Sequence, residues 1–216
     1  MIGKSETPYK TSTDRLNPFS GMLGDYRVIL GNTGRDNRVE FGYRAPHALW
    51  YESPTWSGAP FKAMFSPGQI RADDNSNRGS AEQDCAGGNV PGSGALPPSC
   101  NDGSFGNLYS VSIAYAKGPL YLATAYEMHK KVNRTSDTIG FPTTNPADTQ
   151  GDPKGVGDES AFKIGAQYAF ATKTQLSLLW ERTKRKIPSY LEYQNERTRN
   201  NAWWVAVTQP CPIETT

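Results

Sequence analysis

The side chains in this 216-residue chain that could do chemistry are few and scattered. The chain has two histidines, His47 and His129, and its three cysteines are not spaced with them as in a zinc site. Neither histidine stands beside a serine and a carboxylate, as nucleophilic catalysis of the Ser-His-Asp type would suggest. We therefore predict no enzymatic activity, no metal and no cofactor, and we interpret His129 as a rim residue at a strand end.

Charged residues in alternating segments are more informative. Glu127 and Glu181 share the polar side of their segments and could form a catalytic carboxylate pair, although charges that line a polar interior are the favoured interpretation. The residues predicted to line such an interior are Glu52, Lys62, Glu127, Lys163, Gln167, Glu181 and Arg185. The net charge is +2, from 23 basic and 21 acidic residues. This balance lacks the basic excess typical of nucleic-acid binding, so no nucleic-acid partner is expected.

The segment 107–130 shows which elements hold these side chains. Tyr109, Val111 and Ile113 alternate with small or polar residues, and a tight turn follows at 116–119. A period of two indicates strands, because successive strand side chains point to opposite faces. Each strand has about 10 residues with tyrosines near its ends, which is the length and aromatic placement of membrane-spanning β-strands.

The same alternation recurs along the chain. It predicts strands over 45–52, 59–66, 161–170, 174–185 and 201–209, and residues 1–6 read as the end of a strand. Short turns at 53–58 and 171–173 alternate with long loops at 67–106 and 131–159 and with a charged loop of medium length at 186–200. Bacterial outer-membrane barrels have short periplasmic turns and long extracellular loops. No apolar run is long enough for a membrane helix.

The strand count indicates an incomplete barrel. Seven complete strands and a fragment would leave exposed sheet edges, whereas single-chain bacterial barrels close with even numbers. Pro210 and Pro212 cannot extend a ladder because proline lacks the N–H group. We therefore predict that residues 1–216 are one partial barrel domain with strands missing at both ends. The first ten residues have no apolar region typical of a secretory signal, so we expect a longer precursor whose signal peptide is absent from this chain.

Two long segments have special features. Residues 7–44 carry too many apolar side chains for a disordered loop, so we expect this segment to pack against something, with a short helical turn after Asn17-Pro18. Residues 67–106 form a predicted outer loop that contains Cys85 and Cys100. These cysteines could form a disulfide in an oxidising compartment, or remain two free thiols.

Several stretches resemble the general-diffusion porins of Gram-negative bacteria, especially the β-proteobacterial branch. They include TPYKTSTDRLNPFSGMLGDY, GNTGRDNRVEFGYRAPHALWYESP, CNDGSFGNLYS, GPLYLATAYEMHKKVNRTSD, ESAFKIGAQY and KRKIPSYLEYQNERTR. The resemblance implies an all-β, sixteen-stranded antiparallel transmembrane barrel, of which this chain has seven to eight strands. It also implies a homotrimer in the outer membrane, surrounded by lipid, that acts as a water-filled channel for passive diffusion of ions and small hydrophilic solutes.

The resemblance also assigns residues 7–44 to the loop that folds into the barrel and narrows it. The matching constriction residues are the acids Asp14 and Asp25 and the bases Arg35, Arg38 and Arg44. Enteric porins carry a glutamate near the position of Gly21, and this chain has none. For Arg44 and Asp25, ion pairing that only holds the loop in place stays open beside the pore-lining role.

A soluble or surface-attached β-rich binding module, for instance for carbohydrate, is the alternative function. It predicts that the apolar faces are buried inside the protein. The residues concerned are Tyr109, Val111, Ile113, Leu122, Phe162, Ile164 and Leu178. A channel predicts instead that these side chains point outward around a polar interior.

Overall fold

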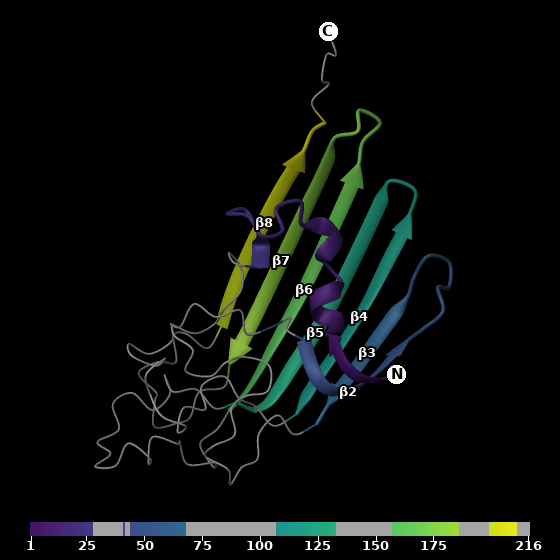
Figure 1. Ribbon diagram of the computed structural model, residues 1–216. Helices are drawn as coiled ribbons and strands as arrows, with labels where there is room; N and C mark the ends of the chain where they lie inside the picture. The colour runs from purple at the N-terminus through teal and green to yellow at the C-terminus, as the bar shows by residue number, and fades with distance from the viewer. Residues whose placement is uncertain (28–40, 42–43, 68–106, 133–156, 186–198, 211–216) are drawn as a thin grey trace, which may run out of the picture.

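The computed structural model describes residues 1–27, 41, 44–67, 107–132, 157–185 and 199–210. In this part of the chain, eight strands form one antiparallel sheet in the order of the sequence (Figure 1). The strands are β1 (Ile2–Glu6), β2 (Arg44–Glu52), β3 (Phe61–Ser66), β4 (Leu108–Lys117), β5 (Leu120–Val132), β6 (Gly157–Ala169), β7 (Gln175–Arg185) and β8 (Arg199–Thr208). The all-β prediction is confirmed, including the strand ending at Glu6.

The short turns gather at one end of the sheet. The β2–β3, β4–β5 and β6–β7 turns lie together at the upper end of the sheet in Figure 1, and the longer connections leave from the opposite end. Gly118 in the β4–β5 turn has φ +55°, a left-handed conformation that glycine adopts without strain. The alternation of short and long connections predicted from the sequence is therefore a difference between the two ends of the sheet.

One face of the sheet is apolar and exposed. Val111, Ile164 and Leu178 are 38%, 47% and 45% exposed, and the cross-strand register puts their neighbours on the same face. Other exposed members of this face are Leu49, Tyr51, Tyr109, Ile113, Leu122, Tyr168, Trp203, Val205 and Val207. The burial that a soluble binding module requires of these side chains is not found, so that prediction is wrong.

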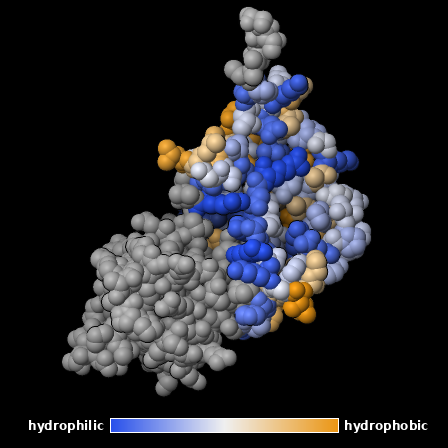
Figure 2. All heavy atoms as spheres, viewed as in Figure 1, coloured by the Kyte–Doolittle hydropathy of each residue, from blue (hydrophilic) through white to orange (hydrophobic). Residues whose placement is uncertain are grey.

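The opposite, inner face carries small, polar and charged residues and is crossed by residues 7–27. This segment holds the helix α1 (Pro8–Thr11) and the 3-10 helix η1 (Asp14–Leu16), drawn in purple in front of the strands in Figure 1. Figure 2 looks onto this face, where hydrophilic residues dominate around the segment. The prediction that the segment packs against something is confirmed for its described part.

The helix within this segment begins earlier than predicted. Proline at the first helical position is the correct signal, but the proline is Pro8 rather than Pro18. Thr7 precedes Pro8 and caps the helix, because its side chain accepts a hydrogen bond from the Lys10 backbone N–H at 3.2 Å. The predicted helical turn after Asn17-Pro18 is wrong: those residues form a turn without helix.

Candidate functional site

Residues 7–27, which we call the inner segment, are attached to the wall by polar contacts at both helices. The Tyr9 backbone N–H donates to Ser110 Oγ on β4 at 2.9 Å, and the Tyr9 hydroxyl donates to Glu181 Oε2 on β7 at 2.7 Å. Tyr121 on β5 donates its hydroxyl to the Ser12 carbonyl at 2.7 Å. The inner segment is therefore bound to strands across the middle of the sheet.

Tyr9 donates to Glu181 as a neutral phenol. Burial, reinforced by the Glu181 carboxylate, raises the pKa of Tyr9 well above its ordinary value. The phenol therefore keeps its proton at any physiological pH. Because Tyr9 is only 2% exposed, this hydrogen bond is shielded from water.

Lys163 on β6 lies directly beneath the inner segment. Its side chain is 2% exposed, and its Nζ donates to Thr13 Oγ1 at 2.7 Å and lies 4.1 Å from the centroid of the Tyr9 ring. Glu181 is its cross-strand neighbour in the register of β6 and β7. A buried ammonium costs free energy unless it is paired and hydrogen-bonded, and here it has a hydroxyl, an aromatic face and a nearby carboxylate. Lys163 thus binds the inner segment to the wall.

An apolar contact completes the attachment at the other end of the inner segment. Leu16 is fully buried and packs in one cluster with Leu179 and Trp204. Gly165 on β6 makes this contact possible, because a Cβ there would lie 2.2 Å from Leu16 Cδ1. Trp204 also donates its indole N–H to the Gly24 carbonyl at 3.0 Å.

A second buried polar cluster lies at the end of the sheet with the long connections. His129 on β5 lies between Glu127 and Glu159, with each of its ring nitrogens 3.1 Å from a carboxylate oxygen. All three side chains are almost completely buried, and the Phe41 ring stacks on the imidazole at 4.7 Å. His129 thus lies near the end of its strand, as the sequence indicates, but its side chain is buried rather than exposed at a rim. The imidazole joins two strands beneath an aromatic ring.

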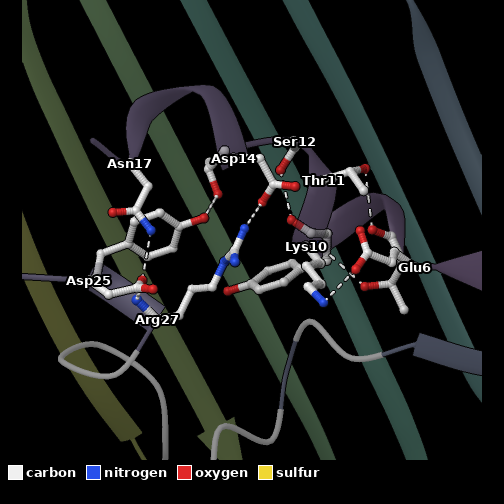
Figure 3. Close-up of polar contacts among 12 residues, drawn as sticks. Glu6, Lys10, Thr11, Ser12, Asp14, Asn17, Asp25 and Arg27 are labelled. Carbon is white, nitrogen blue, oxygen red and sulfur yellow. Dashed lines mark hydrogen bonds and ion pairs between the residues drawn. The ribbon is translucent and has the colours of Figure 1, made fainter. Parts of the chain in front are cut away.

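The two predicted acids of the inner segment have different surroundings, as Figure 3 shows. Asp14 is partly exposed and forms an ion pair with Arg27. Asp25 is 5% exposed and accepts hydrogen bonds from Asn17 Nδ2 at 2.7 Å and from the backbone N–H groups of Gly21 and Arg27, both at 2.9 Å. Asp14 is thus accessible on the side of the inner segment that faces away from the sheet, which we call its open side. Asp25 instead joins residues of the inner segment to one another through hydrogen bonds.

The Asp25 carboxylate is stabilised by its donors. Burial opposes its ionisation, but the N–H groups of Gly21 and Arg27 and the Asn17 amide outweigh burial and lower the pKa of Asp25. Asp25 precedes the helical residues Tyr26 and Arg27 in the position of an N-cap. Asp25 therefore holds the segment in place by accepting backbone hydrogen bonds as a helix cap. Its role in a constriction stays a prediction.

The remaining predicted residues divide into four groups. Glu127, Lys163, Gln167 and Glu181 lie on the inner face but are buried beneath or beside the inner segment. Glu52 and Lys62 lie opposite each other on β2 and β3, are more exposed, and form an ion pair of 3.3 Å. Arg44 begins β2, is exposed and lies in register with Glu6. Arg35, Arg38, Cys85, Cys100 and the side chain of Arg185 lie outside the described residues.

Sequence reasoning missed the basic residues on the open side of the inner segment. Arg15 is exposed, with its guanidinium 5.0 Å from the centroid of the Tyr121 ring. Arg27 and Lys10 are partly exposed and ion-paired with Asp14 and Glu6. The available signals were the position of Arg15 directly after Asp14, that of Arg27 two residues after Asp25, and the spacing of four between Glu6 and Lys10. Within the described residues, no group of three or more His, Cys, Asp or Glu side chains is arranged so that it could hold a metal ion. No helix in the described part is long and apolar enough to span a membrane.

Comparisons with known proteins agree with this geometry. A family model described as Gram-negative porin matches residues 1–210. Among solved structures, the anion-selective porin from Comamonas acidovorans is similar, with a TM-score of 0.56 and 16% sequence identity. The similarity covers 97% of this chain and 48% of that porin, so the chain spans about half of its length. No curated protein matches. The predicted fold, part of a transmembrane β-barrel, is confirmed.

Proposed function

Because the chain belongs to the Gram-negative porin family, we propose that the full-length protein is an outer-membrane channel for passive diffusion of ions and small hydrophilic solutes. The single observation that carries this proposal is the division of the sheet into two faces. The outer face exposes Val111, Ile164 and Leu178, as a lipid-facing surface requires. The inner face is polar and holds the inner segment. The family membership also supports a homotrimer as the working assembly.

The inner segment would set the width of this channel. It covers Lys163 and Glu181 and places Arg15, Asp14 and Arg27 on its open side. Charges that line a narrow passage act on ions over short distances, and the low-dielectric walls focus their field into the passage. The residues that would tune ion passage are therefore those on the open side, together with Arg44 and the Glu52–Lys62 pair on the wall.

We infer an anion preference from the balance of charges. Residues 7–27 contain three bases, Lys10, Arg15 and Arg27, and two acids, Asp14 and Asp25, which leaves one positive charge. The Asp25 carboxylate is buried and accepts hydrogen bonds within the segment, so it contributes little to the charge that an ion meets on the open side. The similar Comamonas acidovorans porin is anion-selective, which supports the same sign here.

Single-channel recording in planar bilayers tests the channel function. The purified, folded full-length protein should produce discrete conductance steps, and heat-denatured protein in the same detergent should produce none. Complete absence of steps from folded protein would contradict the proposal.

The reversal potential in a KCl gradient tests the selectivity. Arg15→Gln and Arg44→Ala should each move it toward that of a cation-preferring channel, because each removes a positive charge. Lys117→Gln changes the same charge in a turn at the far end of the sheet and should leave the potential unchanged. Equal reversal potentials for wild type, Arg15→Gln and Arg44→Ala would contradict the assignment of these residues to the constriction.

A further inference from the structure

Two neighbouring positions of the wall hold one base of the inner segment. Tyr121 on β5 and Gln167 on β6 lie opposite each other in the register of these strands. Gln167 Nε2 donates to the Arg15 backbone carbonyl at 3.3 Å, and the Arg15 guanidinium carbon lies 5.0 Å from the centroid of the Tyr121 ring. The wall therefore contacts both the backbone and the side chain of Arg15.

Arg15 differs from the other two bases of the inner segment in its partners. Lys10 pairs with Glu6 at 2.7 Å, and Arg27 pairs with Asp14. Asp14 and Arg15 are successive residues of the 3-10 helix η1, so their side chains point about 120° apart, and Asp14 is directed toward Arg27 (Figure 3). Among the residues that the structure describes, Arg15 is thus the inner-segment base whose charge is not offset by a carboxylate partner.

The Tyr121 ring is itself held at both ends. Its Cα belongs to the ladder of β5, and its hydroxyl donates to the Ser12 carbonyl at 2.7 Å. A ring that cannot turn aside presents its face at one fixed position. A guanidinium is attracted to the electron-rich face of an aromatic ring, and at an exposed site this attraction favours the stacked arrangement about two- to fivefold.

The position of the Arg15 charge matters for a passing ion. Coulomb interactions weaken with distance, and salt screens them beyond about 10 Å. A stacked Arg15 keeps its charge at one place on the open side. An unstacked arginine side chain would be distributed over many rotamers, and some of these would bring it toward the Asp14 carboxylate, which offsets the charge.

We propose that Tyr121 is a positioning residue for Arg15 and thereby helps to set the ion selectivity of the channel, although Tyr121 carries no charge itself. It acts through its aromatic ring, which holds the guanidinium. Its hydroxyl has a different task, because the hydrogen bond to Ser12 attaches the inner segment to the wall. This inference rests on the proposed function, since it requires Arg15 to lie beside the passage.

Reversal potentials in a KCl gradient, measured on the full-length protein in planar bilayers, test this role. Tyr121→Leu removes the ring and the hydroxyl, whereas Tyr121→Phe removes only the hydroxyl. Arg15→Gln removes the charge, and Tyr121→Leu/Arg15→Gln completes a double-mutant cycle. Tyr168→Leu is the matched control, because it removes a tyrosine ring from the outer face of β6. Circular dichroism verifies the folding of each variant.

Tyr121→Leu should lower the permeability ratio of chloride to potassium in the same direction as Arg15→Gln, but by less. The charge of Arg15 remains in this variant, and only its stacked population falls, by about two- to fivefold. Tyr121→Phe should restore the wild-type ratio, because the ring is retained. In the Arg15→Gln background, Tyr121→Leu should have no further effect. The control variant Tyr168→Leu should behave as wild type does.

Three results would overturn the proposal. Equal shifts in Tyr121→Phe and Tyr121→Leu would assign the effect to the hydroxyl. A Tyr121→Leu shift that persists in the Arg15→Gln background would assign it to a wider passage. A wild-type ratio in Tyr121→Leu would show that the ring does not act on selectivity. If Tyr121→Leu does not fold, Tyr121→Met replaces it with the same expectations.

Failure of the proposed function has a different signature. Folded wild-type protein would then give no conductance steps, or Arg15→Gln would leave the permeability ratio unchanged, and the role of Tyr121 would be refuted with it. Conductance steps and a clear Arg15→Gln shift, combined with any of the three results above, would refute the role of Tyr121 alone.

Discussion

Gly165→Ala is the most direct perturbation of the contact between the inner segment and the wall. The added Cβ would lie 2.2 Å from Leu16 Cδ1, 3.3 Å from Thr13 Cγ2 and 3.4 Å from Leu179 Cδ1. Leu16 is fully buried, so it cannot move aside without displacing its neighbours. Overpacking of this kind costs about 1–3 kcal/mol.

The cost falls on the docking of the inner segment rather than on the sheet. Gly165 belongs to the regular ladder of β5, β6 and β7, whereas Leu16 belongs to a segment held by side-chain contacts. Expelling the Leu16 side chain forfeits about 1.5–3 kcal/mol of burial. At about 2 kcal/mol, the undocked population rises about thirtyfold.

Limited trypsin digestion of the folded full-length protein measures this population. Cleavage after Lys10 or Arg15 requires the segment to leave the wall, so its rate should rise about thirtyfold in Gly165→Ala, in proportion to the open population. Open-channel current noise should rise with it. Ala166→Val adds volume to the same strand on the outer face and should leave the cleavage rate at the wild-type value.

A double-mutant cycle makes the test specific to the steric contact. Leu16→Ala alone should weaken docking by about 2–5 kcal/mol through the cavity it leaves. Leu16→Ala/Gly165→Ala should be less damaging than the sum by about 1–2 kcal/mol, because the new methyl group occupies the vacated space. A cleavage rate for Gly165→Ala within twofold of wild type, or strictly additive effects in the cycle, would refute the reasoning.

Three further predictions concern the polar contacts of the inner segment. Lys163→Met removes the donor to Thr13 and leaves Glu181 buried without its nearby cation. Trypsin cleavage of the inner segment should therefore increase at least tenfold. An unchanged cleavage rate would show that Lys163 does not hold the segment on the wall. Tyr9→Phe removes the donor to Glu181 and should weaken docking by about 1–3 kcal/mol, measured by the same digestion, with Tyr51→Phe on the outer face as a control without effect. Asp25 has a lowered pKa when docked, so its contribution is present above the ordinary carboxyl pKa near 4 and is lost as the pH falls through the lower docked value. Open-channel current noise should therefore increase below about pH 4. Asp25→Asn should show the increased noise already at pH 7. Equal current noise in this variant and in wild type at pH 7 would contradict the role of Asp25 in holding the segment in place.

The fold was largely predictable from the sequence, because strand alternation is a local property. Val111, Ile164 and Leu178 could be assigned to an outward face from their spacing alone, and the turn lengths indicated which end of the sheet carries the long connections. The boundaries were less exact: β6 begins at Gly157 rather than at 161, because ladder pairing with β5 extends beyond the clear apolar alternation. The first helix was misplaced because both Thr7-Pro8 and Asn17-Pro18 could begin a helix. Only the hydrogen bond that the Thr7 side chain accepts as a cap distinguishes them.

The sequence by itself determined the period of two, the two unlike faces of the sheet, and a long segment with too many apolar groups to stay in water. Only the tertiary structure decided which inner charges are covered and which are open. Lys163 and Thr13 meet across 150 positions, and Tyr9 and Glu181 across 172. No local pattern encodes such contacts, since they depend on how one segment lies over strands that are brought together by the sheet. For the same physical reason, Asp25 could be identified as an acid in the right segment, while its use as a cap followed only from the folded turn around it.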